Sequence, residues 1–175
     1  MTRDSRFLSM VLRHNPDSIG LKLDENGWAS VDDLLRKMKA VNRKLTRLEL
    51  EEIVSTNEKK RFTLSEDRTK IRAAQGHSFP IDLGLPPKVP PSTLFHGTAR
   101  SNLDQIFRDG LQPKGRSQVH LSNDTETAKQ VGERHGKPVV LKVDAGRMHS
   151  NGFEFFRADN GVWLCDAVPP IYLGF

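Results

Sequence analysis

The sequence predicts an α+β protein built from two small lobes, and three observations indicate this. Residues 1–79 combine helical hydrophobic patterns with short strands, residues 80–91 are rich in proline, and residues 92–175 consist mainly of strand patterns. A chain of 175 residues is long enough for two lobes of about 80 to 90 residues each. We therefore interpret the proline-rich run as a stiff linker between the lobes.

The first lobe has the element order helix, short strand, two helices and β-hairpin. The first helix is expected over 4–13 with Phe7, Leu8, Val11 and Leu12 on one face. Ser30 is the predicted N-cap of the second helix. The remaining elements are a strand at 27–29, a helix at 46–55 that buries Leu48, Ile53 and Val54, and strands at 61–65 and 70–73 joined by a turn at 66–69. This order is that of a winged helix, a compact fold often used on nucleic acid, although a fold alone does not establish that use.

The second lobe is predicted to contain strands punctuated by two helices. Asn102 is the expected N-cap of the first of these helices and Gly110 is suited to its C-cap. Residues 160–163 are predicted to form a hairpin turn before a strand. The predicted strands are 93–96, 118–121, 138–143, 162–165 and 171–173, and the predicted helices are 102–109 and 124–134.

Charge and cysteine content exclude several classes of protein. The net charge is +5 with a pI near 9.5, and residues 1–90 carry 17 Lys and Arg against 13 Asp and Glu, which favours a polyanionic partner, nucleic acid first. Cys165 is the only cysteine and the six histidines lack zinc-ligand spacing, so we expect neither a disulfide framework nor a metal. The N-terminus is too charged for a signal peptide, and no stretch is long enough to span a bilayer. We expect a cytoplasmic monomer without a membrane partner.

Two histidines stand at the ends of short apolar runs. His96 follows Leu94-Phe95, and His120 follows Val119, with a helical pattern between the two segments. Strand, helix and strand in this order can build a small split sheet that binds NAD. The chain has no P-loop and no G-x-G-x-x-G signature.

Basic residues elsewhere admit two interpretations. Arg13 and His14 end a predicted helix, where positive charge commonly serves the helix dipole. Arg61 lies in a charge run and Arg116 in a loop, and such residues are usually just exposed. If the two lobes close on each other, however, these three arginines can surround one phosphate, for which guanidinium groups are well suited. The segment 75–78 is either a phosphate-binding turn or the exit of the hairpin.

Taken in order, these segments resemble the RNA 2′-phosphotransferase family, which removes the splice-junction 2′-phosphate from tRNA. The resemblance extends from residue 8 to the C-terminal end. It rests on the stretches Leu8–His14, Lys60–Phe62, Ile71–Ala73 with Gln75–Ser78, Phe95–Thr98, Gly115–Arg116 with Val119–Ser122, Asn160–Leu164 and Val168–Leu173. Phe95 stands where a tyrosine is common in the family, and Ala74 where asparagine is frequent.

The resemblance implies a fold, a cosubstrate and a reaction. It implies a winged-helix lobe joined to an ADP-ribosyltransferase-like lobe with a split sheet. NAD is then consumed: the RNA 2′-phosphate attacks the nicotinamide ribose and releases nicotinamide, and O2″ next attacks phosphorus. The products are RNA with a 2′-hydroxyl and ADP-ribose 1″,2″-cyclic phosphate. The RNA partner is tRNA-like.

The resemblance also assigns roles to individual residues. The catalytic group falls on Arg13, His14, Arg61 and Arg116, which also bind the RNA phosphate together with Gln75 and His77. His14 exchanges protons or only binds phosphate; both roles remain open. The NAD-binding residues are His96, Gly97, Thr98, Asn102, His120, Ser122, Gly161 and Trp163.

Two other functions remain as alternatives. The first is a winged-helix nucleic-acid binder without enzymatic activity, which explains the basic first half but gives the two histidines no role. The second is an ADP-ribosyltransferase whose acceptor is a terminal phosphate of nucleic acid or a protein side chain. Release of nicotinamide and release of dephosphorylated RNA distinguish these alternatives.

Overall fold

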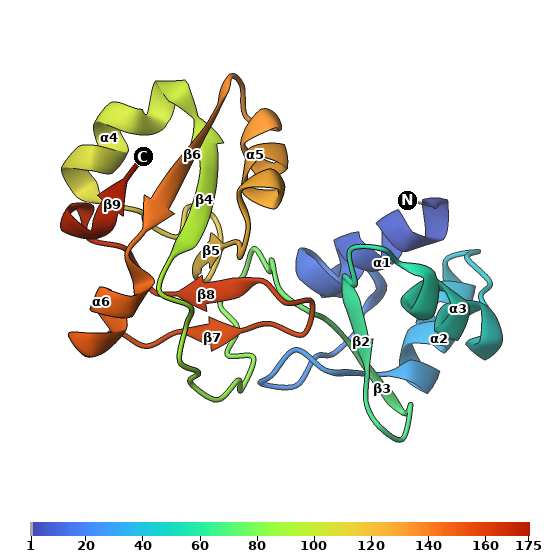
Figure 1. The fold of residues 1–175 in the computed structure, drawn as a ribbon. Coiled ribbons are helices and arrows are strands. Elements are labelled where there is room, and N and C mark those ends of the chain that lie inside the picture. Colours follow the sequence, from blue (N-terminus) through green and yellow to red (C-terminus); the bar gives the residue numbers. More distant parts are fainter. Residues whose placement is uncertain (1) are drawn as a thin grey trace. The chain divides into compact units, whose positions relative to one another are not determined.

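The computed structural model describes residues 2–175 and divides the chain into two compact units (Figure 1). The first unit ends at Gly84 and the second spans Leu85–Phe175, so the boundary falls within the proline-rich run. Each unit combines helices with small antiparallel sheets, which confirms the α+β class. No helix of residues 2–175 is both long enough and apolar enough to cross a membrane.

The first unit follows the predicted order of elements. Side-chain caps begin its three α-helices: the Ser30 hydroxyl accepts the Asp33 N–H as predicted, and Thr46 and Glu49 form a capping box. The strands form an antiparallel sheet of order β1-β3-β2. The elements are α1 (Arg3–Arg13), the 3-10 helix η1 (Pro16–Ile19), β1 (Ala29–Ser30), α2 (Val31–Ala40), α3 (Arg47–Thr56), β2 (Phe62–Leu64) and β3 (Lys70–Ala73).

The core of the first unit corrects the predicted buried face of α3. Leu48 is 78% exposed, whereas Leu50 is fully buried. Residues 50, 53 and 54 share one face of the helix at i, i+3 and i+4, and Leu48 lies about 200° from Leu50 around the helix axis. The core that Leu50 joins includes Leu8, Val11, Leu12, Leu34, Met38 and Ile71.

The second unit contains two three-stranded antiparallel sheets, of order β4-β6-β9 and β5-β8-β7. The predicted hairpin is confirmed: the Gly161 N–H donates to Ala158 O in the turn between β7 and β8, and the φ of Gly161 is 87°. The elements are β4 (Leu94–Ala99), η2 (Arg100–Asn102), α4 (Leu103–Asp109), β5 (Val119–Leu121), α5 (Thr125–Glu133), β6 (Pro138–Val143), α6 (Ala145–Ser150), β7 (Phe156–Arg157), β8 (Trp163–Cys165), η3 (Pro170–Tyr172) and β9 (Leu173–Gly174).

Two local expectations in this unit are wrong, and the prediction of its elements is incomplete. Residues 171–173 lie mainly in η3 rather than a strand, because Pro170 has the fixed φ that suits a first helical position. Asn102 stands at the start of α4 without capping it, since its side-chain amide donates to Thr98 Oγ1. Helix α6 and strand β7 were not predicted, whereas the C-cap at Gly110 is confirmed.

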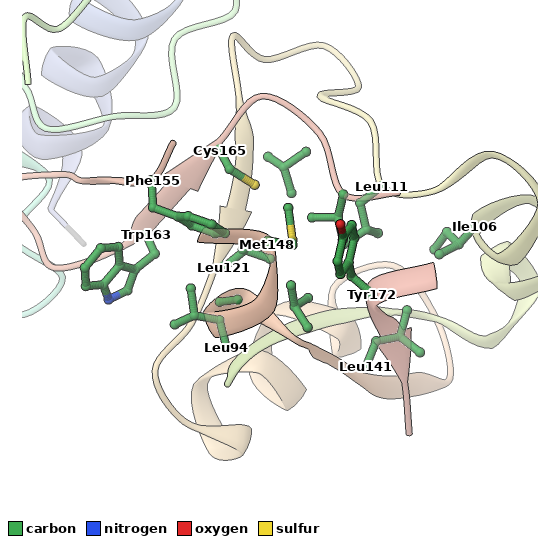
Figure 2. Packing of buried hydrophobic residues seen from close by; sticks show 14 residues of the cluster. Leu94, Ile106, Leu111, Leu121, Leu141, Met148, Phe155, Trp163, Cys165 and Tyr172 are labelled. Carbon is green, nitrogen blue, oxygen red and sulfur yellow. The ribbon is translucent and has the colours of Figure 1, made fainter. Parts of the chain in front are cut away.

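The core of the second unit lies between the two sheets and α6 (Figure 2). Phe155, Met148 and Leu121 are almost completely buried there. Trp163 contributes to the same cluster, although its ring nitrogen reaches a polar partner described below. This core holds β4 and β5, the two strands that carry the conspicuous histidines.

Helix α5 packs directly on β4 at Gly97. A Cβ atom added to Gly97 would lie 1.6 Å from the carbonyl oxygen of Ala128, which is backbone and has little freedom to move. Gly132 makes the same close approach from the helix side, since a Cβ there would lie 2.9 Å from Thr98 O. The glycine after His96 is therefore required by helix packing, whatever further role it has.

We predict that Gly97→Ala destabilises the fold strongly. The new methyl group overlaps the α5 backbone, so α5 must shift, and overpacking of this kind typically costs about 1–3 kcal/mol or more. Gly174→Ala is the matched control, because nothing lies within 4 Å of a Cβ at that strand position. Urea unfolding measures both; equal stability of the two variants would contradict the packing described here.

Candidate functional site

The ladder between β4 and β5 opens directly beside the two histidines. Phe95 and Ser122 exchange both backbone hydrogen bonds, at 2.9 and 2.8 Å. In a continuous antiparallel ladder the next bonded pair would be Gly97 and His120, but the strands belong to separate sheets and no bridge forms there. Instead the His96 ring reaches across, with Nδ1 3.0 Å from His120 O.

This contact determines the tautomer of His96. A carbonyl oxygen only accepts hydrogen bonds, so His96 Nδ1 carries the proton and donates it. Burial lowers the pKa of His96, the hydrogen bond to the His120 carbonyl opposes this effect, and His135 adds to it. The neutral ring therefore presents Nε2 as a hydrogen-bond acceptor.

His120 has the opposite tautomer. Its Nδ1 lies 2.5 Å from Nη1 of Arg116, and because a guanidinium only donates, Nδ1 accepts and the ring proton lies on Nε2. Arg116 comes from the loop before β5 and is exposed. The structure thus brings together Arg116, His96 and His120, with one ring nitrogen that accepts and one that donates.

The backbone of Gly97 adds a donor and an acceptor at the same opening. Successive residues of a strand direct their N–H and C=O groups to alternate sides. Phe95 directs both groups to β5, so Gly97 directs its own toward the side where β5 has diverged. An N–H and a C=O side by side match an amide group.

The other residues expected to bind NAD support the site in different ways. Thr98 is buried, and its hydroxyl accepts a hydrogen bond of 3.2 Å from Asn102, so this pair braces the end of β4. Trp163 is also buried, and its Nε1 donates to Asn123 Oδ1 at 3.0 Å. Ser122 pairs with Phe95 in the last hydrogen-bonded step between β4 and β5. Asn123 was missed in the sequence, where a polar residue after a strand is too common to stand out.

The first unit brings a second group of predicted residues together. The segment 75–78 lies against the C-terminal end of α1: the Ser78 N–H donates to Arg13 O at 2.9 Å, and a Cβ on Gly76 would lie 3.4 Å from the Arg13 guanidinium carbon. Arg61 adjoins the same segment, since its carbonyl accepts the Ala74 N–H at 2.8 Å. His14 is exposed at the end of α1.

Gln75 and His77 differ from the others because their side chains are buried. His77 is 2% exposed and packs its ring edge-to-face on Phe79, with centroids 5.4 Å apart. Among residues 2–175, Gln75 Oε1 and both ring nitrogens of His77 have no hydrogen-bond partner. Burial, followed by the charges of Arg13, Arg72 and His14, lowers the pKa of His77 to about 4.

Arg72 is a structural residue of this region that the sequence did not reveal. It is buried on β3, and its guanidinium carbon lies 4.5 Å from the centroid of the Trp28 ring. It also donates to Leu83 O at 2.8 Å and Asn26 O at 3.3 Å. Arg72 thereby attaches the segment after the hairpin to the first unit. The sequence did contain one signal of this buried role, because Arg72 stands between apolar residues of a predicted strand.

The buried His77 predicts a pH dependence of folding. Its pKa is about 4 in the folded state and near 6.5 when unfolded, so the unfolded state binds more protons between these values. The free energy of unfolding should therefore fall by about 3 kcal/mol as pH drops from 6.5 through 4. Urea unfolding of His77→Leu, compared with wild type across this range, should show a shallower slope; an identical slope in the variant would contradict the assignment.

Comparison with known proteins places the chain in a family. Residues 1–167 match the family described as RNA 2′-phosphotransferase, Tpt1 / KptA family. The chain is 60% identical over 172 residues to a protein of Agrobacterium fabrum named probable RNA 2′-phosphotransferase, covering 98% of this chain and 92% of the relative. A protein of the same name from Burkholderia pseudomallei is 51% identical, covering 99% of this chain and 95% of the relative. The protein therefore belongs to the RNA 2′-phosphotransferase family.

Proposed function

We propose that this transferase removes an internal 2′-phosphate from RNA with NAD as a consumed cosubstrate. The reaction passes through 2′-phospho-ADP-ribosylated RNA and yields 2′-hydroxyl RNA, nicotinamide and ADP-ribose 1″,2″-cyclic phosphate. Family membership supports removal of the 2′-phosphate. The single observation that supports NAD is the opened ladder at His96 and His120, whose donors and acceptors fit an amide and a ribose.

NAD fits this part of the second unit because its polar groups find partners there. We propose that the N–H and C=O of Gly97 bind the nicotinamide carboxamide, whose C=O and NH₂ are complementary to them. The acceptor Nε2 of His96 and the donor Nε2–H of His120 then hold ribose hydroxyls, with Ser122 beside them. Thr98, Asn102, Gly161 and Trp163 keep the strand ends and the hairpin in place. Bound NAD supplies the electrophilic ribose carbon.

Arg13, Arg61 and Arg116 are proposed to hold the RNA 2′-phosphate. The first step needs orientation of an anionic nucleophile rather than a strong base. The second adds negative charge to a phosphoryl group, and fixed guanidinium groups stabilise that charge without reorganisation. Backbone N–H groups of residues 75–77 can contribute, whereas the buried His77 side chain acts through packing.

His14 is proposed to move the proton that the second step requires. It is exposed at the end of α1, next to Arg13. A histidine titrates near neutral pH and can take the proton of O2″ or return one to the departing 2′-oxygen. We interpret the first unit as a winged-helix lobe for RNA and the second unit as an ADP-ribosyltransferase-like lobe for NAD.

We predict that phosphate removal requires NAD with a fixed stoichiometry. Because the phosphate is transferred to ribose, each 2′-phosphate removed should release one nicotinamide and no inorganic phosphate. The measurement is chromatography of the products from a 2′-phosphorylated oligoribonucleotide, with and without NAD. Removal of phosphate without NAD would contradict the mechanism, and nicotinamide release without dephosphorylated RNA would favour simple ADP-ribosyl transfer.

We further predict that Arg61→Ala and Arg116→Ala slow the second step more than the first. Loss of one donor to a developing negative charge typically costs about 10²–10³ in rate, so the ADP-ribosylated RNA should accumulate. Single-turnover assays with RNA resolved by gel electrophoresis detect this species. Arg108→Ala on α4 is the matched control, because this exposed arginine pairs only with its neighbour Asp109 in residues 2–175. Wild-type rates in both site variants would refute these roles.

A further inference from the structure

We infer that the exposed face of α1 binds the RNA backbone on one side of the 2′-phosphate, an inference that rests on the proposed function. At 100° per residue, Arg3, Arg6 and Arg13 lie within a third of the helix circumference. The opposite face buries Leu8, Val11 and Leu12 in the core. The arginine stripe, as we call Arg3, Arg6 and Arg13, thus leads along the outside of α1 to the residue proposed to hold the phosphate.

The charge of this stripe is not neutralised at its N-terminal end. Arg3 and Arg6 are exposed, and within residues 2–175 neither lies within 4.0 Å of a carboxylate. Other arginines of the unit behave differently, since three of them form ion pairs: Arg36 with Asp33, Arg47 with Asp32, and Arg68 with Glu51. Exposed guanidinium groups without a carboxylate partner, such as those of Arg3 and Arg6, favour a polyanion.

A fourth arginine is held beside the stripe. The guanidinium carbon of Arg43 lies 4.2 Å from the centroid of the Phe7 ring, and Phe7 is about 40° from Arg3 around the helix. Stacking on an aromatic ring fixes the plane of the guanidinium and leaves its N–H groups available at the rim. Arg43 therefore widens the basic surface at the N-terminal half of α1.

The length of the stripe fits a short stretch of nucleic acid. Arg6 and Arg13 are seven residues apart and Arg3 and Arg13 ten, which gives about 10 and 15 Å along the helix. Phosphates in a helical strand follow at about 3.4 Å along the axis, so the stripe matches roughly three to four nucleotides. Contacts to phosphates alone do not read bases, so this surface would bind flanking RNA of any sequence.

An anionic membrane is the other polyanion to consider. A helix that lies on a bilayer inserts its apolar face. The fully buried residues of α1 include Leu8, Val11 and Leu12, which lie in the protein core, whereas Arg3 and Arg6 are exposed. The structure therefore favours RNA.

The test compares binding of long and minimal RNA by two charge-matched variants. Arg3→Ala/Arg6→Ala removes two charges from α1, and Lys39→Ala/Lys70→Ala removes two exposed charges from α2 and β3. Figure 1 shows the turn that precedes β3 at the opposite end of the unit from α1. Fluorescence anisotropy without NAD measures binding of a 2′-phosphorylated trinucleotide and of an oligoribonucleotide with roughly four nucleotides on either side of the modification.

For the arginine variant, affinity for the long RNA should fall about tenfold at low salt, and the salt slope should become shallower by roughly 1.4, or 0.7 for each lost contact. Binding of the trinucleotide should change by less than about twofold, because it is too short to reach both arginines. The lysine variant should resemble wild type with both RNAs. Circular dichroism verifies that each variant is folded.

Three outcomes would overturn the inference: equal losses in both variants, equal losses on long and minimal RNA, or no difference between the arginine variant and wild type. Retention of wild type on anionic vesicles that is lost in the arginine variant, with RNA binding unchanged, would show a membrane surface instead. Because binding is measured without NAD, failure of the proposed phosphate transfer leaves these results interpretable.

Discussion

The ladder step between Phe95 and Ser122 is the constraint on which the second unit depends. Its two backbone hydrogen bonds join sheets that otherwise pair only among their own strands. One step further the strands separate, and the His96 ring takes the carbonyl of His120 that a ladder would have used. The join therefore creates the opening and orients both histidines in it.

Orientation matters because the two rings must offer different groups. The carbonyl partner gives His96 an acceptor at Nε2, and the Arg116 partner gives His120 a donor at Nε2. At Gly97 the backbone of β4 lies in close contact with that of α5, so β4 cannot move further toward the helix. Polar groups that are already held in place lose little conformational entropy when the substrate binds.

The first unit also holds its polar groups in place through contacts between segments, but it uses different elements. The end of α1 and the segment after β3 are joined through Arg13 and Ser78, while Arg61 adjoins the same segment through Ala74. His77 and Arg72 are buried in the same unit, and the two His77 ring nitrogens have no hydrogen-bond partner among residues 2–175, which costs free energy. Arg72 donates to backbone carbonyls of two other segments and so supports this framework. Cationic side chains stay close to one another only if such a framework supports them, since like charges repel.

The sequence alone determined the features that depend on neighbouring residues. The helix capped by Ser30, the turn at Gly161 and the α+β class followed from periodicity and turn chemistry. The two histidines stood out because each follows a short apolar run, although His96 and His120 lie inside β4 and β5 rather than at their ends. Tertiary structure decided which face of α3 is buried, why position 97 must be glycine and which tautomer each histidine has. Each of these results from contact between segments far apart in the chain, and local patterns carry no record of which segments meet.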